Sequence, residues 1–281
     1  SFAIIVPQDY SKELLSGREA RVQVIFDGSD SNTASIAVGY ADTVLQAYSA
    51  ELRKLAIERK AGREFPIPVE PRLRVWYNSE LKSKNYIVPG LIAVILMIIS
   101  ALLTSLTIAR EWEMGTMEQL LTTPLRAAEL VLGKMLAFFA LGVVDALTAV
   151  AIGVLIFDVP FRGSLLLLFM TTCIFLTGSL CWGILISALA RSQLLAFQMG
   201  VISSFLPAFL LSGFIFSIEN MPWVVQFVTY IVPARYFVTL LKGIFLKGVG
   251  VNVLWPEITF LFLYSLFVFV AATRKVGSRL A

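Results

Sequence analysis

The most informative stretch of this sequence is Ala109-Arg110-Glu111-Trp112-Glu113-Met114-Gly115-Thr116-Met117-Glu118-Gln119-Leu120-Leu121-Thr122-Thr123-Pro124. It holds four charged side chains, three of them acidic, and it directly follows an apolar run, Tyr86–Ile108, that holds none. Because carboxylates are costly in hydrocarbon, we expect the stretch at a membrane surface between two spans. Its pattern is typical of an amphipathic surface helix, which could transmit force from a soluble partner.

The composition of the chain is that of a membrane protein. Its 281 residues are 58% hydrophobic and 15% charged, with a mean hydropathy of +0.81, whereas soluble domains are about 25% charged. A membrane helix needs about 20 mainly apolar residues. The sequence therefore predicts a mainly α, polytopic helical membrane protein. The expected spans are Tyr86–Ile108, Val131–Phe157, Ser164–Ala190, Leu194–Phe216 and Leu254–Thr273.

Residues 1–85 differ from the rest and predict a small α/β domain. They hold 12 of the 23 Lys and Arg residues and 11 of the 19 Asp and Glu residues. Ala20–Phe26 alternates polar and apolar residues as a strand does, and apolar residues recur every three or four positions from Thr33 to Arg59, as in a helix. Because the chain opens inside an expected strand, we expect the domain to be incomplete at its N-terminal end. The other expected elements are strands at Phe2–Val6 and Glu70–Tyr77 and a short helix at Asp9–Leu15.

Lysine and arginine in the short loops predict which side of the membrane each segment faces. If residues 109–130 face the cytoplasm, that side holds seven of these cations and the opposite side four. The bias places the C-terminus with residues 109–130 in the cytoplasm. Parity over five spans then places residues 1–85 outside, which requires an upstream span or a signal ahead of Ser1.

Residues 217–250 are unusually apolar for an external loop. They form two apolar pieces, and Pro222, Pro233 and Arg235 leave neither piece long enough to span a membrane. We expect a re-entrant pair of half-helices that enters from the outer face, since broken backbone is tolerated where protein buries it. Two further true spans are the alternative.

Enzyme chemistry has little support in the sequence. No GxxxxGK[ST] phosphate-binding loop occurs, because Met135 follows Gly133-Lys134 and Ala128 stands where the first glycine would be. The chain has no histidine, which excludes Ser-His-Asp and Cys-His catalysis and cysteine–histidine metal sites. We expect no catalytic residue, metal or bound cofactor. Because the net charge of +4 is not gathered in a basic arm, nucleic acid is not an expected partner.

Two residues inside expected spans are candidates for a translocation path. Asp145 lies near the middle of the second span, where a carboxylate costs about 2.5–3.5 kcal/mol and needs a partner or water. It is either a protonation or cation site, or it bonds to hydroxyls of the next span, and both remain open. Pro207 predicts a kink in the fourth span whose freed carbonyl Ser203 or Ser204 could satisfy. The hydroxyls available to Asp145 are those of Thr171, Thr172, Thr177 and Ser179.

The charged stretch predicts a capped helix of its own. Gly115 and Thr116 give a break and an N-cap, and Gln119 follows Thr116 by three residues as in a capping box. Glu118 falls in the first turn, where the helix dipole favours an acid. Pro124 ends the element, and a second helix is expected to begin near residue 127.

Three motifs in this order resemble those of type-2 ABC exporter permeases. Residues 110–121 followed by Pro124 are similar to the family's cytoplasmic signature. The chain looks closest to the drug-efflux subgroup, whose members have six membrane helices and a large external domain after the first. The other similar segments are Leu211-Ser212-Gly213-Phe214-Ile215-Phe216, Glu219-Asn220-Met221-Pro222 and Ile231-Val232-Pro233-Ala234-Arg235-Tyr236-Phe237 in the re-entrant region, and Asp27-Gly28-Ser29-Asp30-Ser31-Asn32-Thr33-Ala34 in the external domain.

The resemblance implies the permease subunit of an ATP-binding-cassette exporter that moves hydrophobic drugs or similar amphiphiles out of the cytoplasm or inner leaflet. Two permeases, identical or sister chains, would bind two cytoplasmic ATPase subunits, which would hold ATP and Mg. Residues 110–124 would form the coupling helix that contacts the ATPase. The implied coupling residues are Arg110, Glu111, Glu113, Gly115, Thr116, Glu118 and Pro124, and the implied residues of the external re-entrant region are Glu219, Pro222, Pro233 and Arg235.

The resemblance also implies a place in the cell. The chain would lie among the lipids of a bacterial inner membrane with residues 1–85 in the periplasm, docking an adaptor of the membrane-fusion type and an outer-membrane channel. A lipid or polysaccharide exporter permease of the same class is an alternative. Two other classes are an ion-coupled secondary transporter that uses Asp145 and a membrane-anchored receptor or scaffold.

Overall fold

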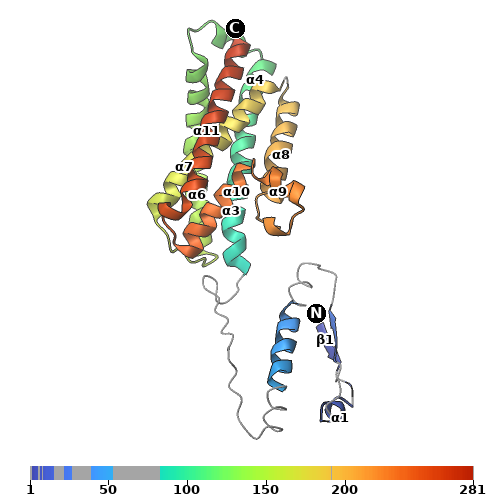
Figure 1. Cartoon of the computed structure of the whole chain (residues 1–281). Helices are drawn as coiled ribbons and strands as arrows, with labels where there is room; N and C mark the ends of the chain where they lie inside the picture. The colour runs from blue at the N-terminus through green and yellow to red at the C-terminus, as the bar shows by residue number, and fades with distance from the viewer. Residues whose placement is uncertain are drawn as a thin grey trace. The chain divides into compact units, whose positions relative to one another are not determined.

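A computed structural model of the chain describes residues 2–5, 7, 9–15, 22–26, 39–52, 83–190 and 192–280. The chain divides into two compact units, residues 1–73 and residues 74–281. The second unit holds the membrane helices (Figure 1).

The first unit combines strands and helices, as the sequence predicts. Strand β1 (Phe2–Ile5) pairs with β2 (Gln23–Phe26) in an antiparallel sheet in which Phe2 lies opposite Phe26. Helix α1 (Tyr10–Leu15) lies between them in the chain, and residues 39–52 form a further helix. The expected strand Glu70–Tyr77 lies outside the described residues, as do both ends of the helix expected from Thr33 to Arg59.

The second unit contains five helices long and apolar enough to cross a membrane among its described residues. The first begins at Ser83, three residues earlier than predicted, and the last begins at Val251, so that Pro256 and Glu257 lie inside it. This confirms the polytopic helical class. The helices are α3 (Ser83–Ser105) continued by α4 (Thr107–Glu113), α6 (Ala127–Leu155), α7 (Leu165–Leu189), α8 (Gln193–Leu210) and α11 (Val251–Leu280).

Helix α7 lies at the centre of the bundle, packed against α3, α6, α8 and α11 (Figure 1). Half of its most apolar window is buried and 56% of that of the span formed by α3 and α4, against 17% for α6 and 22% for both α8 and α11. Glycines allow this packing: Gly183 lies directly against Thr104 and Ala101 of α3, and Gly178 against Ser265 of α11. A helix that is apolar all round and buried on several sides is expected at a bundle centre.

The region between α8 and α11 is a bent pair of short helices. Helix α9 (Trp223–Thr229) meets the segment Pro233–Lys247 at 84°, the geometry of a broken span or a re-entrant loop. The second piece packs against α3, α7 and α11, and the ring of its buried Phe237 stacks on Phe175 of α7 at 4.0 Å between centroids. Because the 84° bend suits a broken span as well as a re-entrant loop, the re-entrant assignment stays a prediction. The pieces of this region are η1 (Ile218–Asn220), α9, α10 (Pro233–Lys242) and the π-helix η2 (Gly243–Lys247).

Candidate functional site

The charged stretch forms two short helices rather than one. Helix α4 is separated from α3 only by a turn at Leu106 and ends at Glu113, and α5 (Met117–Leu121) follows after a turn at residues 114–116. Gly115 has φ +72° and open space around it, a conformation that glycine adopts at little cost. Helix α6 then begins at Ala127, as predicted, three residues after Pro124.

Thr116 is the N-cap residue of α5, but the predicted capping box is wrong. Its φ and ψ of −74° and −15° are helical, whereas a capping side chain needs an extended backbone to reach the next turn. Its hydroxyl instead donates to the carbonyl of Glu111 at 3.4 Å. One of the two hydrogen bonds of a capping box occurs instead at the start of α6, where the backbone N–H of Arg126 donates to Oε2 of Glu129 at 3.0 Å.

The N-terminal end of α4 is fixed by a side chain of α7. Oγ of Ser187, fully buried, accepts hydrogen bonds from the backbone N–H groups of Ile108 and Ala109, both at 2.9 Å. The break at Leu106 frees these donors from the α3 ladder, and a buried N–H needs a partner. Ser187 therefore caps α4 from a helix far away in the sequence, and nothing in the local pattern indicated it.

Two acidic residues of α4 also bind other helices. Glu111 forms an ion pair with Lys134 of α6. Oε2 of Glu113 accepts a hydrogen bond from the backbone N–H of Gln193, the first residue of α8, at 2.9 Å. Ser192 completes that N-terminus, because its hydroxyl accepts from the N–H of Leu195 at 3.3 Å. The α4 helix is thus attached to three spans, α6, α7 and α8.

The outer surface of the stretch includes exposed residues that make none of these contacts. Arg110 and Glu118 are exposed and have no ion pair with any residue in the part of the chain that the structure describes. Met114, at the turn, has 60% of its surface exposed, and Pro124 is exposed as well. The stretch and the last turns of α11 lie at the same end of the bundle (Figure 1).

The two predicted path residues do not come together, and their predicted partners are not found. Asp145 is half-exposed on α6 and has no hydrogen bond or ion pair with any other residue that the structure describes. Two of the expected hydroxyls, those of Thr171 and Thr177, donate to carbonyls of their own helix. Ser179 is buried and has no hydrogen-bond partner among the residues that the structure describes. The choice between a functional and a structural Asp145 stays open.

Pro207 lies inside α8, but neither predicted serine satisfies the carbonyl that it frees. Oγ of Ser203 accepts from the indole Nε1–H of Trp182 at 3.2 Å, and Oγ of Ser204 is buried with no partner. Ser204 is buried on a helix that packs mainly against α3, and Ser203 accepts from the indole on α7.

A cavity of about 770 Å³ lies between α8 and α11 and reaches α3, α7 and the bent pair. Pro207 and Ser203 line it from α8, and Trp182 lines it from α7. Its wall is apolar and rich in aromatic rings, the usual character of small-molecule sites. The remaining lining residues are Met97, Leu211, Val228, Tyr230, Ile231, Val232, Pro233, Phe260, Leu263, Tyr264, Phe267 and Val268.

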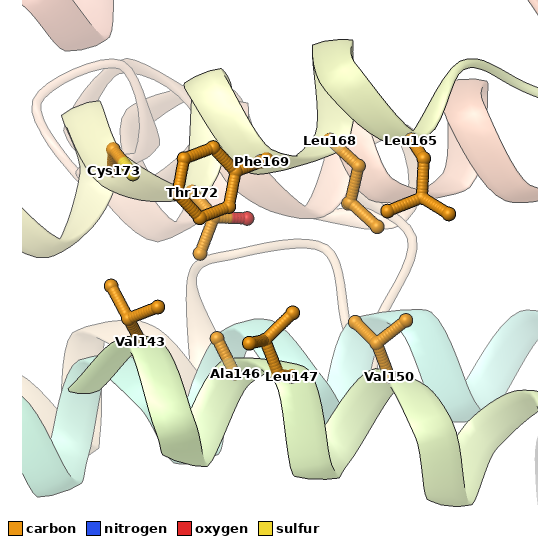
Figure 2. A pocket seen from close by; sticks show the side chains of 9 residues that line it. All are labelled: Val143, Ala146, Leu147, Val150, Leu165, Leu168, Phe169, Thr172 and Cys173. Atoms are coloured by element: carbon orange, nitrogen blue, oxygen red, sulfur yellow. The ribbon is translucent and has the colours of Figure 1, made fainter. Parts of the chain in front are cut away.

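A second, much smaller cavity lies between α6 and α7 (Figure 2). Its volume is about 30 Å³, and side chains of the two helices face one another across it. Ala146 lines it but Asp145 does not, and Thr172 and Cys173 are the lining residues with a polar atom in the side chain. This cavity is therefore no polar path for an ion. No group of three or more acidic, cysteine or histidine residues able to hold a metal occurs within the described segments.

The residues predicted for the external region lie on the bent pair. Pro222 precedes α9 and Pro233 begins α10, which suits residues with fixed φ and no N–H donor. Glu219 lies exposed in η1. The guanidinium of Arg235 lies over the Tyr230 ring, 4.0 Å from its centroid, and donates to the hydroxyl of Thr229.

The chain is similar to several known membrane proteins. Residues 1–274 match the model of a family described as "ABC-2 family transporter protein". The chain is 40% identical over 246 residues to "Probable multidrug ABC transporter permease YbhS" of Escherichia coli K12, covering 87% of this chain and 64% of that protein. It is 37% identical over 271 residues to "Probable multidrug ABC transporter permease YbhR" of the same organism, covering 96% and 70%. "Inner membrane transport permease YhhJ" of Escherichia coli K12 is 28% identical over 262 residues, covering 92% and 67%.

The sequence thus spans about two thirds of the length of these relatives. The family match extends over both the α/β unit and all five membrane helices. On these matches, the chain belongs to the ABC-2 family of transporter proteins.

Proposed function

We propose that the chain is the membrane-spanning permease subunit of an ABC exporter, driven by ATP hydrolysis in a separate subunit. The observation that carries this proposal is the attachment of α4 to α6, α7 and α8 beside an exposed turn. A short surface element held by three spans can pass a displacement to the membrane domain, which a free loop cannot. The absence of a GxxxxGK[ST] loop from the sequence supports a separate ATPase.

The surface offered to the ATPase would be the turn at Gly115 with its exposed neighbours Arg110, Met114 and Glu118. Glu111 and the exposed Glu113 would act through their contacts with α6 and α8. ATP and Mg would bind to the partner, and their binding would displace this surface. In this proposal the charged stretch and the C-terminus face the cytoplasm of a bacterial cell.

The proposed substrates are hydrophobic drugs or similar amphiphiles. The names of two relatives carry the word "multidrug", and the cavity beside α8 offers Trp182, Phe260 and Tyr264 to an apolar or aromatic molecule. A lipid-linked substrate of a lipid or polysaccharide exporter would need the same apolar wall and is the alternative within the class.

The proposed assembly contains two permeases, identical or sister chains, and two ATPase subunits in a bacterial inner membrane. Residues 1–85 would face the periplasm and contact an adaptor of the membrane-fusion type, which would lead to an outer-membrane channel. Closed two-fold assemblies are the commonest form of soluble oligomers, and a paired ATPase requires a paired surface.

Site-directed photo-crosslinking tests the proposal. A crosslinking amino acid at Met114, on the exposed turn, should capture a subunit that binds ATP. The same group at Leu155, 81% exposed at the other end of α6, is the matched control and should not. Proteoliposomes of the captured complex should accumulate a fluorescent amphiphile with ATP but not without it. Equal capture from both positions, or accumulation without ATP, would contradict the proposal.

A further inference from the structure

Helix α8 begins at a carboxylate supplied by the charged stretch. Oε2 of Glu113 lies 2.9 Å from the backbone nitrogen of Gln193, 80 residues further along the chain. The first N–H groups of a helix lack partners within the helix, and its dipole favours an anion there. The contact therefore fixes the start of a membrane-spanning helix to the end of α4.

Helix α8 is also one wall of the large cavity. Ser203 and Pro207 line that cavity from α8, and Tyr264 and Phe267 line it from α11 on the other side. On a neighbouring face of α8 lies a row of small buried residues, of which Gly200 packs against Ser105 of α3 and Ala196 packs near Ala109 of α4. Small residues on such a face let the backbones of the two helices approach closely. The width of the cavity thus depends on where α8 lies on α3. The row consists of Ala196, Gly200, Ser204 and Ala208.

We propose that Glu113 is the positioning residue through which a displacement of residues 107–121 moves α8 and changes the width of the cavity between α8 and α11. This rests on the proposed function, because the partner ATPase supplies the displacement. Ser187 holds the other end of α4 on α7. Lys134 holds Glu111 between these two points, so a force on the exposed turn reaches α6 and α8 together, and Glu113 is the contact through which it reaches α8.

The other two acids of the stretch do not have this connection. Glu111 pairs with Lys134 on α6, and α6 contributes no lining residue to the large cavity. Glu118 is exposed on α5 and has no hydrogen bond or ion pair with any residue that the structure describes, so its replacement removes the same charge without that connection.

Distance measurements by electron paramagnetic resonance test the proposal on the full-length protein, bound to its ATPase subunits in lipid nanodiscs. Spin labels at Ile202 on α8 and Leu266 on α11, both more than half exposed, report the separation of the two walls, with Cys173 and Cys181 replaced by alanine. A non-hydrolysable ATP analogue should shift the distance distribution in the parent protein. The shift should be lost in Glu113→Ala and kept in Glu113→Gln, whose amide oxygen still accepts, and in Glu118→Ala.

A second variant removes the same bond from the other side. Gln193→Pro deletes the N–H donor at the first position of α8, where proline suits a helix, and the extended backbone of Ser192 (φ −141°, ψ 158°) suits the residue before a proline. Gln193→Pro should lose the nucleotide-dependent shift in distance, and it tests the same hydrogen bond if Glu113→Ala does not fold.

The outcomes separate the two claims. A nucleotide-dependent shift in Gln193→Pro or Glu113→Ala as large as in the parent overturns the role of Glu113. A parent that exports substrate with ATP but shows no shift between α8 and α11 overturns it as well. A parent that binds no ATPase subunit, or exports without ATP, instead overturns the proposed function.

Discussion

Glu111 of α4 and Lys134 of α6 form an ion pair whose side chains are only 26% and 16% exposed. A pair this far from water is more costly to break than a surface pair, because the remaining partner keeps an uncompensated charge. It attaches the charged stretch to α6 independently of the bond between Glu113 and α8.

Replacement of the cation should therefore destabilise the membrane domain. We expect Lys134→Met to lower the free energy of unfolding by about 1.5–3 kcal/mol, the usual range for a hydrogen bond to a charged group. Unfolding in mixed detergent micelles with rising dodecyl sulfate measures it. The double variant Glu111→Lys with Lys134→Glu restores an ion pair and should recover part of the loss, whereas a non-interacting pair would give additive losses.

Ser187→Ala should weaken the junction between α3 and α4. It leaves two buried N–H groups without an acceptor, at a cost of about 1–3 kcal/mol each before relaxation. Ser179→Ala on the same helix is the control, because that hydroxyl is buried without a partner and its removal should cost nothing or stabilise. The same unfolding measurement compares them, and equal losses would refute the capping role.

Gly183→Ala should disrupt the packing of α7 on α3. A Cβ there would lie 1.9 Å from Oγ1 of Thr104 and 2.4 Å from the backbone oxygen of Ala101, so a helix must shift, at about 1–3 kcal/mol or more. Gly133→Ala on α6 meets nothing within 4 Å and should stabilise by up to about 1 kcal/mol through helix propensity. Thermal aggregation in detergent ranks both against the parent, and no difference between them would mean that α3 and α7 lie further apart.

Gly115→Pro should separate ATP hydrolysis from export. Proline holds φ near −65°, whereas Gly115 has φ +72°, so the exposed turn between α4 and α5 cannot keep its shape. The protein should still insert, because α4 and the spans are intact, while export falls to background and substrate no longer stimulates the ATPase. Gly115→Asn is the control, since asparagine tolerates positive φ. Substrate stimulation retained in the proline variant would show that the turn is not part of the coupling surface.

The spans and their order could be predicted from the sequence, because apolar length alone selects helices that can cross a membrane. The break near Gly115 could also be predicted, since its residue types are local signals. The contacts of Ser187 and Gln193 could not: each joins residues 78 to 80 positions apart, and their residue types occur throughout the chain. The family resemblance implies that Glu113 takes part in coupling to the ATPase, which stays a prediction, and the structure adds a hydrogen bond from Gln193 to its exposed carboxylate.

The intramembrane polar residues show the same limit. Hydrogen bonds to hydroxyls of the next helix are one of the two roles predicted for Asp145, but threonines in helices readily bond their own preceding carbonyls, and Thr171 and Thr177 do so. Which side chains lie opposite Asp145 depends on how α6 packs in the bundle, and its position along the span does not determine this.

The carbonyl of Gly213 accepts hydrogen bonds from the hydroxyl of Tyr86 at 2.9 Å and from Nζ of Lys242 at 3.0 Å. Gly213 follows the last residue of α8 by three positions. The beginning of α3, the end of α8 and the end of α10 are therefore joined at one point. With Glu113 at its first residue and this junction beyond its last, α8 is attached at both ends to other helices. A displacement of its first turn cannot carry the whole helix across the membrane plane, and it must appear as bending within α8, where Pro207 has already removed a backbone hydrogen bond.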